Sequence, residues 1–149
     1  MEYRAVKKER TGWRDLGLSQ RHRLWGWDVP AVDIDFPLLE YDKCKAKAII
    51  EYKSMSAKEV SPYDASYLAL ADLGTRAELP VFECRYSCDF TRYNVTPLNA
   101  VAKKYLPQIK LMSEKQWVTF LYFLRGRELP ESLFNEEGFL RSVQKTLGI

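Results

Sequence analysis

The chain has 149 residues, of which 46% are hydrophobic and 29% charged, and its formal net charge is +3. This length and composition predict one globular domain with a core of useful size. No apolar run reaches the length of a transmembrane helix, and neither a phosphate-binding glycine loop nor a nucleophile elbow is present. The mild positive charge permits contact with nucleic acid without indicating it.

The cysteines indicate a reducing compartment. Cys44, Cys84 and Cys88 lack the Cys-x-x-Cys spacing of metal ligands, and His22 is the only histidine, so zinc is not expected. An odd count in an ordinary chain favours free thiols. Residues 1–10 are charged and lack the apolar segment of a secretory signal. We therefore expect a cytoplasmic protein.

The amino-terminal part of the chain is basic. Residues 1–15 form either a basic arm that contacts phosphates or a solvated terminus. A short helix is predicted over residues 19–25, with Ser19 as its N-cap. Three of its side chains are candidates for contact with a nucleic-acid backbone: Arg21, His22 and Arg23. A structural hydrogen bond is the alternative role for His22.

Residues 32–53 predict a β-hairpin whose strands carry charged side chains. Asp33 and Asp35 lie on the first strand, and the second strand ends in Glu51-Tyr52-Lys53. The polar residues 42–44 are the predicted turn, because a loop of about three residues is an ordinary hairpin length. This turn would place Tyr41 opposite Lys45.

The same register would bring the charged groups of the hairpin to one face. It places Asp35 opposite Glu51 and Asp33 opposite Lys53. Successive side chains of a strand point to opposite faces, so these four side chains share one face. A two-residue turn would shift the register by one and separate them.

Three carboxylates and an amine on one face indicate a cation-binding site. Like charges at close range repel unless a cation lies between them. Carboxylate oxygens suit a hard divalent ion such as Mg²⁺, with Mn²⁺ as a substitute. Such an ion orients a phosphodiester and activates water, and Lys53 would position that water or neutralise the transition state. The alternative is a solvated sheet face with charges on alternate positions.

These residues resemble the motif of the PD-(D/E)XK nuclease superfamily, in which an aspartate precedes a strand that ends in Glu-x-Lys. The matching residues are Asp35 or Asp33, then Glu51 and Lys53. The usual Pro-Asp dipeptide is absent, since Pro30 lies three residues before Asp33, and this leaves the choice of first aspartate open. The resemblance covers residues 19–93 and includes the order helix, hairpin, helix, strand. It implies magnesium-dependent cleavage of nucleic-acid phosphodiesters and does not name the substrate.

Helix and strand signals alternate after the hairpin. A helix is predicted to begin with Ser61 as its N-cap, to pack on the sheet and to end at Gly74. Strands are predicted over residues 81–86 and 91–95, and the first of these should continue the sheet beside the Glu-x-Lys strand. Cys84 is expected to pack inside it.

The carboxyl-terminal third predicts further helices. A short helix over residues 100–105 is followed by a capping box formed by Ser113 and Gln116. The next helix should end at Gly126, and a last helix is predicted over residues 139–147. An apolar stripe on the capped helix is expected to be core or dimer interface: Trp117, Phe120, Leu121 and Leu124.

We therefore expect an α/β domain over residues 1–149, with a restriction-endonuclease-like central mixed sheet of about four or five strands flanked by helices. The expected function is that of a small metal-dependent nuclease that hydrolyses DNA. Asp35 and Glu51 would bind magnesium, with Asp33 assisting or replacing Asp35, and Lys53 would work with the attacking water. A homodimer would let so small a chain span a duplex or a junction.

Two rival functions stay open at this point. The first is a nuclease-like fold that binds nucleic acid or a host protein without cutting, and the second is an assembly protein whose aromatic stripes are contact surfaces. The sequence also leaves open DNA or RNA as the substrate and exonucleolytic or endonucleolytic cleavage. A short stand-alone nuclease would suit a phage or a mobile element, which would place it in the host cytoplasm.

Overall fold

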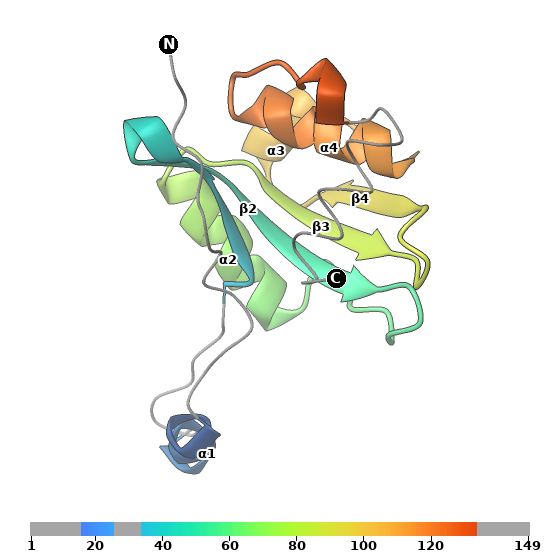
Figure 1. Cartoon of the computed structure of the whole chain (residues 1–149). Helices are drawn as coiled ribbons and strands as arrows, with labels where there is room; N and C mark the ends of the chain where they lie inside the picture. The colour runs from blue at the N-terminus through green and yellow to red at the C-terminus, as the bar shows by residue number, and fades with distance from the viewer. Residues whose placement is uncertain (1–15, 26–33, 134–149) are drawn as a thin grey trace.

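A computed structural model describes residues 16–25 and 34–133 of the chain (Figure 1). Five strands form one mixed sheet in the order β1-β2-β3-β4-β5. The strands are β1 (Phe36–Glu40), β2 (Lys45–Ser54), β3 (Val81–Tyr86), β4 (Tyr93–Pro97) and β5 (Lys110–Met112). The helices are α1 (Leu16–Trp25), α2 (Ala65–Arg76), α3 (Ala100–Tyr105) and α4 (Glu114–Leu124), with 3-10 turns η1 (Tyr41–Lys43) and η2 (Glu131–Leu133). The predicted α/β class, a mixed sheet flanked by helices, is confirmed.

Helices cover both faces of the sheet. Strands β2 and β3 are parallel and the other neighbouring pairs are antiparallel, so α2 is the crossover between the two parallel strands (Figure 1). Ile49 and Val81 pack with Leu70 of α2. The next residue on each strand, Ile50 or Phe82, packs in the core on the other face, which α4 covers. The alternation of side chains along a strand thus assigns residues 49, 51 and 53 of β2 and the odd-numbered residues of β3 to the α2 face.

The face covered by α4 is an aromatic core. Trp117 is 2% exposed and donates its indole N–H to the Tyr52 hydroxyl at 3.2 Å. The Phe82 and Phe120 rings meet edge to face, with centroids 5.4 Å apart, a geometry that aromatic pairs favour. The apolar stripe predicted on this helix is therefore part of the core. The predicted capping box is confirmed, since Ser113 and Gln116 each accept the other's backbone N–H.

Helix α2 differs from its prediction at both ends. Its N-cap is Asp64, which accepts the Ser66 N–H at 3.0 Å, so the prediction of Ser61 as N-cap is wrong. The helix also continues to Arg76, two residues past Gly74. A β-carbon at Gly74 would lie 2.2 Å from Val81 Cγ2, so this glycine allows the helix to approach β3 closely and does not end it.

Other predicted bounds are partly right. The bounds of β3 and α3 are as predicted, and Gly126 follows α4 with a φ of +75°. Helix α1 begins at Leu16, so Ser19 lies inside it and is not its N-cap. Strand β4 begins at Tyr93 because a hydrogen-bonded turn around Asp89 occupies the preceding residues. Strand β5 was not predicted, since three residues are too few to show alternation. The arm predicted over residues 1–15 and the helix predicted over 139–147 lie outside the described residues.

The β1–β2 hairpin contains a bulge. Phe36 pairs with Ile50 and Leu38 with Ala48, but Leu39 pairs with Ala46, so the pairing skips Lys47. Four residues, 41–44, connect the strands, and the prediction of Tyr41 opposite Lys45 is wrong. The bulge offsets the additional loop residue. The open end of the hairpin therefore keeps the predicted register.

An ion cluster fastens the tip of this hairpin to the segment after α4. The Glu40 carboxylate is 1% exposed and receives two hydrogen bonds from the Arg127 guanidinium, which also contacts Asp42 at 2.8 Å. Arg125 lies 3.6 Å from the same carboxylate. The Arg127 hydrogen bonds hold the pKa of Glu40 below its usual value of 4.5, against the effect of burial. The hairpin is thus held at its tip by charge and at its base by the sheet.

The described helices are all too short or too polar to cross a lipid bilayer.

Candidate active site

Three carboxylates lie in a row on the face covered by α2: Asp35 immediately before β1, Glu51 on β2 and Glu83 on β3. Glu51 of β2 pairs with Glu83 of β3 in parallel register. Asp35 directly precedes β1, where Phe36 pairs with Ile50, so the same register places Asp35 opposite Glu51. Neighbouring strands are separated by about 4.8 Å, and the charge of Asp35 acts on the Glu51 carboxylate.

Glu51 is at the centre of this row and is 9% exposed. Its Oε1 lies 3.4 Å from Lys53 Nζ, while its buried Oε2 accepts no hydrogen bond. Burial raises the pKa of Glu51, the charge of Asp35 raises it further, and Lys53 opposes both effects. A buried carboxylate with one unpartnered oxygen and a like charge beside it would be stabilised by a bound cation.

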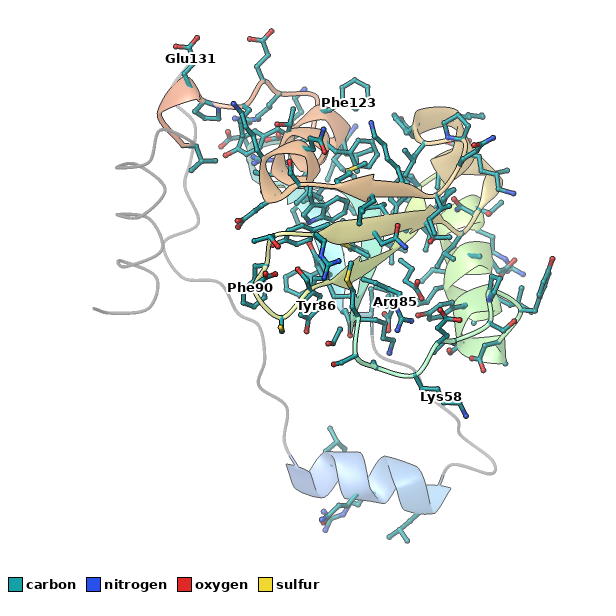
Figure 2. The ribbon with its side chains drawn as sticks, turned by 90° about the vertical axis from the view of Figure 1, so that its right-hand side faces the viewer. Lys58, Arg85, Tyr86, Phe90, Phe123 and Glu131 are labelled. Carbon is teal, nitrogen blue, oxygen red and sulfur yellow. The ribbon has the colours of Figure 1, made fainter. Side chains whose placement is uncertain are left out.

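Two basic residues lie one step further along the strands. Lys53 and Arg85 are paired in the parallel register of β2 and β3, so they share the face of the carboxylate row. Lys53 is one-third exposed. Arg85 donates to the backbone carbonyls of Ser54 and Ala57, and Figure 2 places it between the sheet and the loop that carries Lys58. Arg85 therefore fastens this loop, whereas Lys53 faces the carboxylates.

Two further residues lie at this site: Glu83, to which the sequence assigned no role, and Tyr67, for which packing was preferred over a place in the cleft. Glu83 is 7% exposed, and Tyr67 of α2, which is 3% exposed, donates its hydroxyl to Glu83 Oε2 at 2.6 Å. Burial, followed by Glu83 and then by the charge of Glu51, raises the pKa of Tyr67 well above its usual range. One signal was present in the sequence: Glu83-Cys84-Arg85 repeats the acid-x-base pattern of Glu51-Tyr52-Lys53. An acid in the middle of an apolar strand is also uncommon unless it is paired.

The structure brings together three of the predicted site residues, Asp35, Glu51 and Lys53. Arg21 lies on α1, is exposed and donates to the Gly17 carbonyl at 3.4 Å. Helix α1 lies apart from the sheet in both views (Figures 1 and 2), so Arg21 is not brought to the carboxylate row. The side chains of His22 and Arg23 lie outside the described part of the chain, as does Asp33.

The chemistry of the donor set fits a magnesium ion. Within residues 16–25 and 34–133, no three side chains of histidine, cysteine, aspartate or glutamate surround a common point. Magnesium ordinarily uses only one or two protein carboxylates and retains waters or substrate phosphate oxygens for the rest of its octahedron. Asp35 and Glu51 provide such a pair, and the unpartnered Glu51 Oε2 is the oxygen that most requires a positive partner.

No family model, no curated protein and no solved structure matches this chain.

Proposed function

We propose that this protein is a magnesium-dependent nuclease that hydrolyses phosphodiester bonds of DNA. The observation that carries the proposal is the group formed by Asp35, Glu51 and Lys53 on one face of the hairpin, with the Lys53 amine 3.4 Å from the Glu51 carboxylate. One or two carboxylates suffice to hold Mg²⁺ beside a substrate phosphate, and a nearby amine adds positive charge for the phosphate oxygens.

Each residue has a distinct role in this proposal. Asp35 and Glu51 bind the ion from adjacent strands, and the rigid sheet fixes their separation. When bound, Mg²⁺ supplies Lewis acidity at the phosphate and lowers the pKa of a coordinated water. The Lys53 ammonium donates hydrogen bonds to phosphate oxygens and stabilises the charge that develops on them. Burial of Glu51 lowers the local dielectric and strengthens these interactions.

A cleavage assay with matched variants tests this proposal. Supercoiled plasmid, linear duplex, single-stranded DNA and RNA are each incubated with the full chain in Mg²⁺, Mn²⁺ or EDTA. We expect DNA cleavage with either ion and none with EDTA. Asp35→Asn, Glu51→Gln and Lys53→Met should each lower the rate by at least about 100-fold, because each removes a charge that acts on the transition state.

Lys45→Met is the matched control. Lys45 lies on the same strand as Lys53, is exposed, and sits at the hairpin tip, away from the carboxylates. Its rate should equal that of the wild type, and circular dichroism should show that all four variants fold. Failure to cut any of the four substrates with either ion would refute the nuclease. DNA binding without cleavage would then favour the binding protein with a nuclease-like fold.

Dimerisation is a separate part of the proposal. A homodimer would place two carboxylate sites on one duplex or junction, which is why we include it for a chain of this size. Sedimentation should show a concentration-dependent dimer, or one that forms when a short duplex is added. A monomer under both conditions removes the dimer and leaves the proposed chemistry in place.

A further inference from the structure

The unexplained pair at the site is Glu83 and Tyr67. Both side chains are more than nine-tenths buried, and the hydroxyl of Tyr67 donates to Glu83 Oε2 at 2.6 Å. A donor–acceptor distance this short is typical of a hydrogen bond to an ionised carboxylate. Glu83 is therefore fixed to α2 at one of its two oxygens.

Burying Glu83 at this position lowers the stability of the fold, so stability does not explain why an acid is there. It pairs in register with Glu51, so two buried acids lie side by side on adjacent strands. Like charges in a region of low dielectric repel, and burying either one has a desolvation cost. Val81, two residues earlier on the same face, shows that an apolar side chain fits under α2. Local conflicts of this kind are expected at functional sites.

The two acids have different partners. Glu83 is held from the side of α2 by Tyr67, whereas Glu51 contacts Lys53 through Oε1 and leaves Oε2 unpartnered. Tyr67 holds Glu83 on the β3 side of Glu51, and the charges that act on the Glu51 carboxylate are those of Asp35 and Lys53. A second acid fixed on the β3 side leaves that carboxylate beside Asp35 and Lys53, with an oxygen available for a ligand.

We propose that Glu83, fixed by the Tyr67 hydroxyl, is a positioning residue of the cation site. This inference rests on the proposed function, because it assumes that Asp35 and Glu51 bind the ion. Glu83 adds negative charge one strand away and keeps Glu51 Oε2 free for the ion. Replacing Glu83 by glutamine would remove this charge and offer an amide N–H to Glu51, which would satisfy the oxygen that the cation needs.

Direct binding of Mn²⁺ to the full chain, without nucleic acid, tests this inference. Free Mn²⁺ is quantified by its electron paramagnetic resonance signal during titration of the protein. Loss of groups that orient metal ligands ordinarily weakens metal binding by about 10- to 100-fold. We expect a Kd increase in that range for Glu83→Gln and for Tyr67→Phe.

The two variants separate charge from hydrogen bond. Glu83→Gln retains an oxygen that accepts the Tyr67 hydroxyl, and Tyr67→Phe retains Glu83 while releasing it. The matched controls are Tyr63→Phe and Glu59→Gln, since both residues are exposed. Thermal unfolding identifies any variant that fails to fold. If Tyr67→Phe fails to fold, the Mn²⁺ Kd of Glu83→Gln alone tests the inference. A merely structural role would lower the melting temperature and leave the Kd of the folded protein unchanged.

A second readout uses cleavage. Weakened ion binding should raise the Mn²⁺ concentration needed for half-maximal cleavage, while saturating Mn²⁺ restores the rate in both variants. The role of Glu83 would be overturned if Glu83→Gln bound Mn²⁺ with an unchanged Kd while Glu51→Gln lost Mn²⁺ binding. The proposed nuclease function would not be affected by that result. Absence of Mn²⁺ binding by the wild type would overturn both.

Discussion

At the scale of single residues, Glu51 contributes less to stability than an apolar residue would. Its pKa is raised from the usual 4.5, first by burial and then by the charge of Asp35. A folded carboxyl with a raised pKa binds its proton more tightly than the unfolded chain does. The stability that protonated Glu51 contributes is therefore fully present below pH 4.5 and is lost as the pH rises through the pKa of Glu51 in the folded protein.

We expect Glu51→Gln to raise the melting temperature at neutral pH, because the amide carries no charge to desolvate. The gain should vanish well below pH 4.5, where glutamate is protonated in both states. Thermal unfolding of both proteins over a pH series measures this difference. Mg²⁺ should raise the melting temperature of the wild type only. A variant that is less stable than the wild type at neutral pH would contradict this account.

At the scale of elements, α2 and β3 meet at Gly74. An added β-carbon would lie 2.2 Å from Val81 Cγ2 and 3.0 Å from the Leu79 carbonyl oxygen. Gly74→Ala should cost about 1–3 kcal/mol of overpacking, partly offset by the roughly 1 kcal/mol that alanine gains in helix propensity. Denaturant unfolding of Gly74→Ala, Val81→Ala and the double variant measures the coupling. The cost of Gly74→Ala should be smaller in the Val81→Ala background, and additivity would show that the two residues do not clash.

The ion cluster at the hairpin tip makes a second prediction at this scale. Arg127→Met leaves the buried Glu40 carboxylate without its two strongest hydrogen bonds, so it should destabilise the protein strongly at neutral pH. The pKa of Glu40 is lowered, so its contribution is present above pH 4.5 and is lost as the pH falls through the folded pKa. The pH dependence is thus opposite in sign to that of Glu51.

Arg76→Met is the control for the ion cluster, because Arg76 and its partner Asp72 are both exposed. Exposed ion pairs contribute little to stability. Chemical denaturation at neutral and acidic pH should therefore show a large loss for Arg127→Met, a small one for Arg76→Met, and a gap between them that narrows in acid. Equal losses at neutral pH would show that the cluster is not specially stabilising.

At the scale of the whole molecule, the reactivity of the buried Cys84 thiol reports how often the core opens. Burial, and then the charge of Glu83, raise the pKa of Cys84 to about 12, whereas Cys44 and Cys88 are exposed. The predicted packing of Cys84 inside β3 is confirmed, since it is fully buried. Because thiolates are the reactive form, a disulfide reagent should label two cysteines quickly in the native protein. The third should react only at the rate of opening of the sheet; fast reaction of all three would show that the core is more open than described.

The sequence predicted local features better than long-range ones. The capping box follows from residue types alone, whereas the predicted register at Asp35 and Glu51 is kept only because the bulge at Lys47 offsets a loop one residue longer than predicted. The prediction of Ser61 as the N-cap of α2 failed because serine and aspartate are both common N-caps, and only the hydrogen bond from the Ser66 N–H to Asp64 identifies the residue that caps the helix. Glu83 was missed because its role depends on the register between β2 and β3, which are separated by a helix. No local pattern encodes that alignment.

The bulge at Lys47 gives this protein tolerance to changes in length. Without it, one added loop residue would move every side chain of β2 to the opposite face and turn Glu51 toward the aromatic core. With it, the unpaired residue Lys47 makes the register at the carboxylate end independent of the loop length at the tip. Natural or engineered chains could therefore lose one residue from the loop and straighten the strand without moving a single carboxylate.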